Sequence, residues 1–194
     1  MHPVDLSTHP RIGRYVDLLR RVSRHTEPAE VQREFANMVK FERSFDGMIS
    51  ISVRGLPRGQ YKITRLNLDD DVGTVTMNPW ERWESIPAHS GGFIGRVIES
   101  PEPKILQHMT VRDDPVLGDR LARFGSCFVN PLFDNGEALN WSLTFRLNPE
   151  GYTADDVVTG LLRGNIIGRT WLSRVMARRV RSEGVKAMIS APVR

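Results

Sequence analysis

Residues 89–147 constrain the fold of this chain of 194 residues more than any other stretch does. Two predicted strands, 127–133 and 138–147, flank an Asp-Asn-Gly sequence that favours a tight hairpin turn, and the second strand alternates apolar and polar residues. Ahead of them, short helices are predicted at 91–98, after paired glycines, and at 114–124, where a proline stands in the first turn. This order predicts an antiparallel sheet that carries an irregular insert with short helices.

Other periodic segments complete an α/β (α+β) arrangement. Extended segments at 46–57, 61–68 and 104–109 bring the predicted antiparallel sheet to five or six strands. Helical periodicity predicts longer helices at 10–24, 28–44 and 154–181. The last of these, the exit helix, begins with a capping box formed by Thr153 and Asp156.

The two faces of the predicted sheet differ in polarity, and this difference locates a candidate site. We expect the terminal helices to cover the face of Ile51, Trp141 and Phe145. An insert at 68–122 then roofs the polar face, which predicts a cavity for a polar small molecule. The candidate ligand-binding residues lie on the strands and at the rim: Ser50, Ser52, Arg65, Asn140, Ser142 and Thr144, with Trp80, Trp83 and His89 at the rim. A loosely packed insert over a water-filled space is the alternative.

The start of the helix predicted at 91–98 has two interpretations. In the first, Ser90 caps the helix while Gly91 and Gly92 allow a tight entry of the chain. In the second, the exposed backbone N–H groups bind an anion with help from Arg96, one turn further on. Two glycines without a lysine or a third glycine are a weak phosphate signal, so we favour the first interpretation.

Composition and charge bound the class of protein. A hydrophobic content of 40% and a charged content of 26% are ordinary for one globular domain, expected at 10–181 with flexible ends at 1–9 and 182–194. No apolar run approaches the roughly 20 residues of a membrane helix, and the N-terminus lacks a signal-peptide pattern, so we predict a cytoplasmic protein without a membrane partner. From residue 163 onward the charge is +7, within a net charge of +4, so the basic residues concentrate at the C-terminal end.

The order of elements over residues 10–180 resembles the GAF domain. SGGFIGRVIESPEPKIL (90–106) is similar to the family's glycine-opened helix and following strand, and DDPVLGDRLARFGSCFVNPLFDNGEALNWSLTFR (113–146) is similar to its closing hairpin block. More narrowly, PLFDNGEALN and NIIGRTWLSRVMARRV resemble the GAF sensor regions found ahead of bacterial serine phosphatases of the sporulation and stress-response type. No metal-binding aspartate array follows Arg181, so the resemblance implies no phosphatase activity.

The chemical variants of this family do not match the residues present. The bilin-binding members use a cysteine next to a histidine, and Cys127 has no adjacent histidine. The methionine sulfoxide reductases of this fold need several cysteines, and this chain has one. The Asn-Lys-Phe-Asp-Glu constellation of the cyclic-nucleotide-binding members is absent as such. No nucleophile–base pair or metal-ligand spacing is evident, so we predict no enzyme, no catalytic or metal-ligating residue and no identified cofactor.

Three hypotheses for function remain. The leading one is a regulatory sensor domain in bacterial signal transduction, which binds an unidentified small molecule, forms a homodimer through its terminal helices and acts on an output domain such as a serine phosphatase. The second is a structural dimerisation module that binds no ligand. The third is nucleic-acid binding through the basic C-terminal helix, which is less favoured because Trp171 is the only aromatic residue available there for base stacking.

Overall fold

The computed structural model describes residues 10–27, 30–31, 34, 45–68, 83–134, 136–158 and 160. The chain divides into two compact units, Met1–Glu42 with Ile166–Arg194 and Arg43–Asn165. The predicted flexible ends at 1–9 and 182–194, and the exit helix beyond residue 160, lie outside the described residues. Within the described ranges, no helix is long and apolar enough to cross a membrane.

The first unit contributes helix α1, Pro10–Arg24, with the bounds that its periodicity predicted. The helix buries Leu18 and Val22, which are one turn apart, whereas Leu19 is 42% exposed. Within the helix predicted at 28–44, the described residues Glu30, Val31 and Glu34 are helical, and the rest of that segment is outside the described residues.

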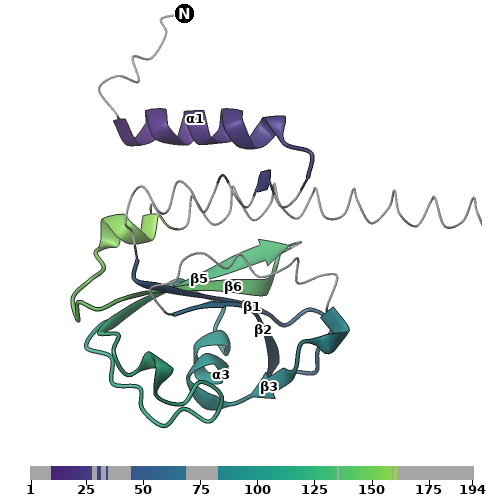
Figure 1. The fold of residues 1–194 in the computed structure, drawn as a ribbon, viewed down its shortest axis with the longest axis vertical. Coiled ribbons are helices and arrows are strands. Elements are labelled where there is room, and N and C mark those ends of the chain that lie inside the picture. The colour runs from purple at the N-terminus through teal and green to yellow at the C-terminus, as the bar shows by residue number, and fades with distance from the viewer. Residues whose placement is uncertain are drawn as a thin grey trace, which may run out of the picture. The chain divides into compact units, whose positions relative to one another are not determined.

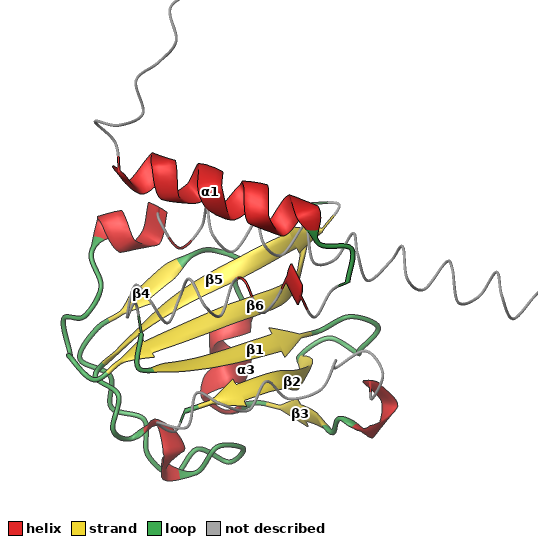
Figure 2. Cartoon of the chain, turned by 45° about the horizontal axis from the view of Figure 1, so that its top comes forward, coloured by secondary structure: helices red, strands yellow, loops and turns green. Residues whose placement is uncertain are grey.

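The second unit is built on one antiparallel sheet of six strands in the order β3-β2-β1-β6-β5-β4 (Figure 2). The strands are β1 Gly47–Ser52, β2 Gln60–Asn67, β3 Ala88–Ser90, β4 Lys104–Leu106, β5 Ser126–Asp134 and β6 Glu137–Arg146. The predicted sheet of five or six antiparallel strands is confirmed. The sequence predicts no strand at the position of β3, because three residues are too few for a recognisable alternation.

The hairpin of β5 and β6 forms where the Asp-Asn-Gly turn predicted it. Gly136 has φ 84°, a left-handed conformation that glycine adopts without strain and that tight hairpin turns require. Strand β6 then pairs along its length with β5 on one side and β1 on the other. This hairpin therefore provides the centre of the sheet.

The insert between β3 and β5 contains helix α3, Gly92–Ile98, and a 3-10 turn at Asp119–Leu121, and a second 3-10 turn, Trp83–Ser85, precedes β3. The helix predicted at 114–124 was wrong. Asp114 closes a bridge with Gly118, and its carboxylate accepts hydrogen bonds from the backbone N–H groups of Val116 and Leu117, both at 2.9 Å. A short aspartate that bonds its own following backbone competes with helix formation, which leaves only the short 3-10 turn.

The insert packs on the apolar face of the sheet, which corrects the predicted facing. The core joins the strand side chains Ile51, Trp141 and Phe145 to side chains of the insert such as Phe93 and Leu121. The sequence predicts instead that the terminal helices cover this face. The reason for the error is that the insert has an apolar surface of its own: α3 buries four of its seven residues.

The start of the exit helix lies on the other side of the sheet from α3 (Figure 1). Residues 154–158 and 160 are helical, and the capping box predicted for Thr153 and Asp156 is formed. Helix and sheet meet where Asn130 Nδ2 donates to the Gly160 carbonyl at 3.1 Å and Tyr152 OH donates to Thr144 Oγ1 at 3.0 Å. The polar face of the sheet therefore meets the exit helix, and the apolar face meets the insert.

Candidate functional site

Most of the predicted site residues on the strands belong to the face turned away from the insert. Arg65, Ser50, Ser142 and Asn130 are cross-strand neighbours on β2, β1, β6 and β5, so they form one polar row across the sheet. Thr144 lies on the same face and accepts a hydrogen bond from Tyr152. The prediction that this row forms a floor beneath the insert was wrong, because the insert covers the opposite face.

Arg65 is the charged end of this row, and its side chain is largely buried. Desolvation lowers the pKa of Arg65 to about 10, because a guanidinium ion loses its hydration when it is buried. Ser50 and Ser142, next to it in the row, are half-buried. Whether these side chains contact a ligand stays a prediction.

Ser52 and Asn140 belong to a separate polar cluster at one end of the sheet. Ser52 is buried and donates to the Leu139 carbonyl at 3.3 Å. The Asn140 amide, in the orientation that satisfies both its ends, donates to Ser52 Oγ at 2.9 Å and accepts from Arg54 Nε at 3.2 Å. Arg54 in turn donates to Asp134 at 2.8 Å, which links the β1–β2 turn to the hairpin of β5 and β6. These bonds indicate that Ser52 and Asn140 have a structural role, because they join the β1–β2 turn to the β5–β6 hairpin.

The predicted rim residues lie at the β2–β3 edge of the sheet. The amine of Lys62, a buried residue, donates to the Trp83 carbonyl at 2.7 Å and lies 4.5 Å from the centre of the Trp83 ring. His89 lies against the ring of Tyr61, with 5.9 Å between the ring centres. Trp83 and His89 therefore serve as anchors in this structure, and Trp80 lies outside the described residues.

Asp114 holds the insert together, and sequence reasoning missed this role. Its carboxylate accepts from the N–H of Phe93 at 2.6 Å, at the start of α3, as well as from Val116 and Leu117. Burial raises the pKa of Asp114, but the hydrogen bonds from Phe93, Leu117 and Val116 and the charge of Arg96 outweigh that effect and lower the pKa below its usual range. The carboxylate is therefore ionised and caps the helix.

This internal anion corrects both interpretations of the helix start. Ser90 makes no capping bond, and the residue before the helix is Gly91. The Phe93 N–H, which an external anion would use, is bonded to Asp114. Gly92 is required here, because a side-chain Cβ at that position would come within 2.8 Å of an Asp114 carboxylate oxygen. An aspartate in an Asp-Pro pair, followed by apolar residues, is a weak sequence signal for such an anchor.

Aromatic rings fill one end of the layer between the insert and the sheet, and a polar atom marks the other end. The rings of Phe124 and Phe93 lie 5.2 and 6.4 Å from that of Phe145. Four residues along β6, Trp141 is 4% exposed, and its indole Nε1 is buried without a hydrogen-bond partner within the described part of the chain. Sequence reasoning treated Trp141 as a purely structural residue, although a buried tryptophan normally finds a partner for its N–H.

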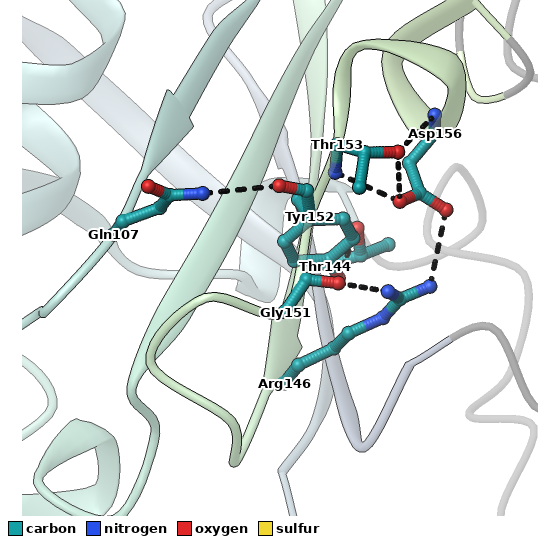
Figure 3. Close-up of polar contacts among 7 residues, drawn as sticks. All are labelled: Gln107, Thr144, Arg146, Gly151, Tyr152, Thr153 and Asp156. Carbon is teal, nitrogen blue, oxygen red and sulfur yellow. Dashed lines mark hydrogen bonds and ion pairs between the residues drawn. The ribbon is translucent and has the colours of Figure 1, made fainter.

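The junction between the sheet and the exit helix is a polar cluster of seven residues joined by hydrogen bonds and an ion pair (Figure 3). Arg146 donates to the Gly151 carbonyl and to Asp156, the latter at 3.3 Å, and Gln107 donates to the Tyr152 carbonyl at 3.0 Å. Burial raises the pKa of Asp156. Hydrogen bonds from Thr153, and the charge and hydrogen bond of Arg146, outweigh this effect and bring the pKa below its ordinary value. Asp156 is therefore a charged capping residue tied to β6.

The junction also fixes the protonation state of Tyr152. Burial raises the pKa of this phenol well above its ordinary value, and the protonated hydroxyl donates to Thr144 Oγ1. The Tyr152 ring packs 6.0 Å from that of Phe128 on β5. The exit helix is thus held by groups on both β5 and β6.

Metal-ligand groups and the single cysteine were the remaining candidates for chemistry among the described residues. No group of three or more histidine, cysteine, aspartate or glutamate residues able to hold a metal ion occurs among the residues that the structure describes. Cys127 is fully buried, and desolvation raises the pKa of its thiol well above the ordinary value, which makes it a poor nucleophile.

Comparisons with known proteins identify the fold. A scan against family models and a search of curated proteins find no match. Among solved structures, the chain is similar to the GAF domain of a phosphoenolpyruvate-protein phosphotransferase from Coxiella burnetii, with 13% identity over 87% of this chain and 96% of that one, at a TM-score of 0.54. It is also similar to the GAF domain of a two-component sensor histidine kinase from Bacillus halodurans, with 8% identity over 77% of this chain and 96% of that one, at a TM-score of 0.53.

A third similar structure is a segment of a methyl-accepting chemotaxis protein, residues 122 to 287, with 14% identity over 84% of this chain and 98% of that one, at a TM-score of 0.55. At these identities the comparisons establish the fold alone. The fold is that of GAF domains, as the sequence predicted, and no comparison bears on the narrower resemblance to phosphatase sensor regions.

Proposed function

We propose that this chain is a regulatory, signal-sensing domain that responds on the insert side of its sheet and acts through its exit helix. The observation that carries the proposal is the alternation of side chains along β6. Trp141, Leu143 and Phe145 pack in the core with the insert, while Thr144 and Arg146 bond the start of the exit helix. A shift of this one strand changes both sets of contacts, which suits a domain that passes a signal through its sheet. The occurrence of the same fold in a sensor histidine kinase supports this reading.

The signal that we propose is a small molecule bound near Trp141. The rings around Phe145 already fill the other end of the insert layer. The indole N–H of Trp141, which has no hydrogen-bond partner among the described residues, is a donor for a ligand that is largely apolar and carries one hydrogen-bond acceptor. We propose the polar row of Ser50, Arg65 and Ser142 as a second surface that contacts a ligand. If it does, Ser142→Ala should bind the ligand more weakly than the wild type.

Native mass spectrometry of the purified protein tests for a retained ligand, and indole N–H resonances of ¹⁵N-labelled protein locate it. The chain has four tryptophans, so the Trp141 resonance is assigned by its loss in Trp141→Phe. We expect this resonance to shift when a retained molecule is removed by unfolding and refolding, and the resonance of Trp83, assigned with Trp83→Phe as the matched control, to stay in place. A protein that carries no molecule as purified, and whose Trp141 resonance is unchanged by refolding, is instead the ligand-free dimerisation module.

The proposed output is a homodimer that acts on a partner domain, such as a serine phosphatase, in the cytoplasm. This part rests on the sequence, because the apolar positions of the exit helix extend beyond what its own sheet needs. Light scattering should give a mass near twice 22.0 kDa, falling to the monomer in Leu172→Glu. A monomer that retains nucleic acid and releases it steeply with salt supports the third hypothesis.

A further inference from the structure

Asn130 on β5 is a buried amide of which only one end is hydrogen-bonded within the part of the chain that the structure describes. It is 4% exposed, and its Nδ2 donates to the Gly160 carbonyl of the exit helix at 3.1 Å. Its Oδ1 is also buried and has no hydrogen-bond partner within the described ranges. A buried acceptor without a donor destabilises the folded state, so an apolar side chain of similar size would suit this place better on stability alone.

The helix comes unusually close to the sheet at the same point. A Cβ at Gly160 would lie 2.3 Å from Cε1 of Phe128, two residues before Asn130 on the same face of β5. The helix backbone therefore rests directly on the Phe128 ring. Contact of a bare backbone with a ring has little directionality, whereas the bond from Asn130 selects one carbonyl of the helix.

We propose that Asn130 specifies the position of the exit helix on the sheet, at a cost in stability. Apolar contacts tolerate sliding and rotation of a helix, but a buried amide that bonds one carbonyl favours a single register. A lone buried asparagine fixes register and partner number in coiled coils by the same physics. The inference rests on the proposed function only in treating the exit helix as the output element. In that case a signal that moves the helix along the sheet has to break the bond between Asn130 and Gly160.

The test compares Asn130→Leu with the wild type in urea unfolding, amide hydrogen exchange and NMR. We expect the urea midpoint to be unchanged or higher, while exchange of the amides at 155–158 becomes about tenfold faster and their resonances double or broaden. A residue with a merely structural role would lower the midpoint instead. Val158→Ala, at a side chain that is 59% exposed on the same helix turn, is the matched control and should change neither property.

A second pair of variants tests the close approach of the helix to Phe128 independently of Asn130. Gly160→Ala should displace the helix and speed exchange at 155–158, and Phe128→Ala in the same chain should restore the slower exchange by making room for the methyl group. The proposal is overturned if Asn130→Leu retains one set of helix resonances with wild-type exchange, or if its midpoint falls. That outcome would leave ligand sensing at Trp141 untouched, just as the absence of a retained ligand would leave the role of Asn130 untouched.

Discussion

Removing the Asp114 carboxylate should destabilise the second unit more than any single surface change. In Asp114→Ala the N–H groups of Phe93, Val116 and Leu117 lose their acceptor. Each buried donor left without a partner costs about 1–3 kcal/mol, and the half-buried Val116 N–H is the one that water reaches most readily. We therefore expect a loss of about 3–4 kcal/mol in the free energy of unfolding.

Urea unfolding followed by far-ultraviolet circular dichroism measures this loss, with the urea dependence of the free energy expected to stay unchanged. Asp114→Asn should cost less, about 2 kcal/mol, because its remaining oxygen can serve two of the three donors. Glu102→Ala removes an exposed carboxylate from the same insert and should change the free energy by less than about 0.5 kcal/mol. A loss below about 1 kcal/mol in Asp114→Ala would refute the assignment of Asp114 as the anchor of the insert.

The same carboxylate gives stability a pH dependence whose sign follows from its depressed pKa. A carboxyl group with a lower pKa in the folded than in the unfolded state stabilises the fold fully above the unfolded value of about 3.9. This contribution is lost as the pH falls through the folded pKa. The wild type should therefore lose stability below about pH 4 more steeply than Asp114→Asn does, and equal slopes would contradict the proposed role.

Three further outcomes are expected. Trp141→Ala should lower the free energy of unfolding by about 3–5 kcal/mol in urea titrations, because it empties a large buried volume beneath the insert, and a loss under about 1 kcal/mol would mean that this volume is not packed. Thr153→Ala should cost about 1 kcal/mol in thermal unfolding by removing the cap of the exit helix, while Thr153→Ser should stay close to the wild type; equal losses in both variants would argue against capping. Cys127 should react with a thiol reagent such as dithionitrobenzoate only in denaturant, and rapid labelling of the native protein would contradict its burial.

The strand positions and the hairpin were accessible from the sequence because they depend on local patterns. Alternation along β1 and β6 is a property of neighbouring residues, and a left-handed Gly136 belongs to the turn itself. The capping box of Thr153 and Asp156 spans a single helical turn, so it too could be predicted and is observed. These features need no knowledge of what lies on either side of the sheet.

The partner of each face, and the residues that hold those partners, were decided only by the tertiary structure. A period of two separates the side chains of a strand into two sets, but it does not say which layer covers which set when both faces are covered. The cap of α3 comes from Asp114, 21 residues beyond Phe93, and the Gly160 carbonyl meets Asn130 across 30 residues. Contacts between residues this far apart in the sequence depend on how the chain closes its loops. The composition and periodicity near each residue therefore cannot predict them.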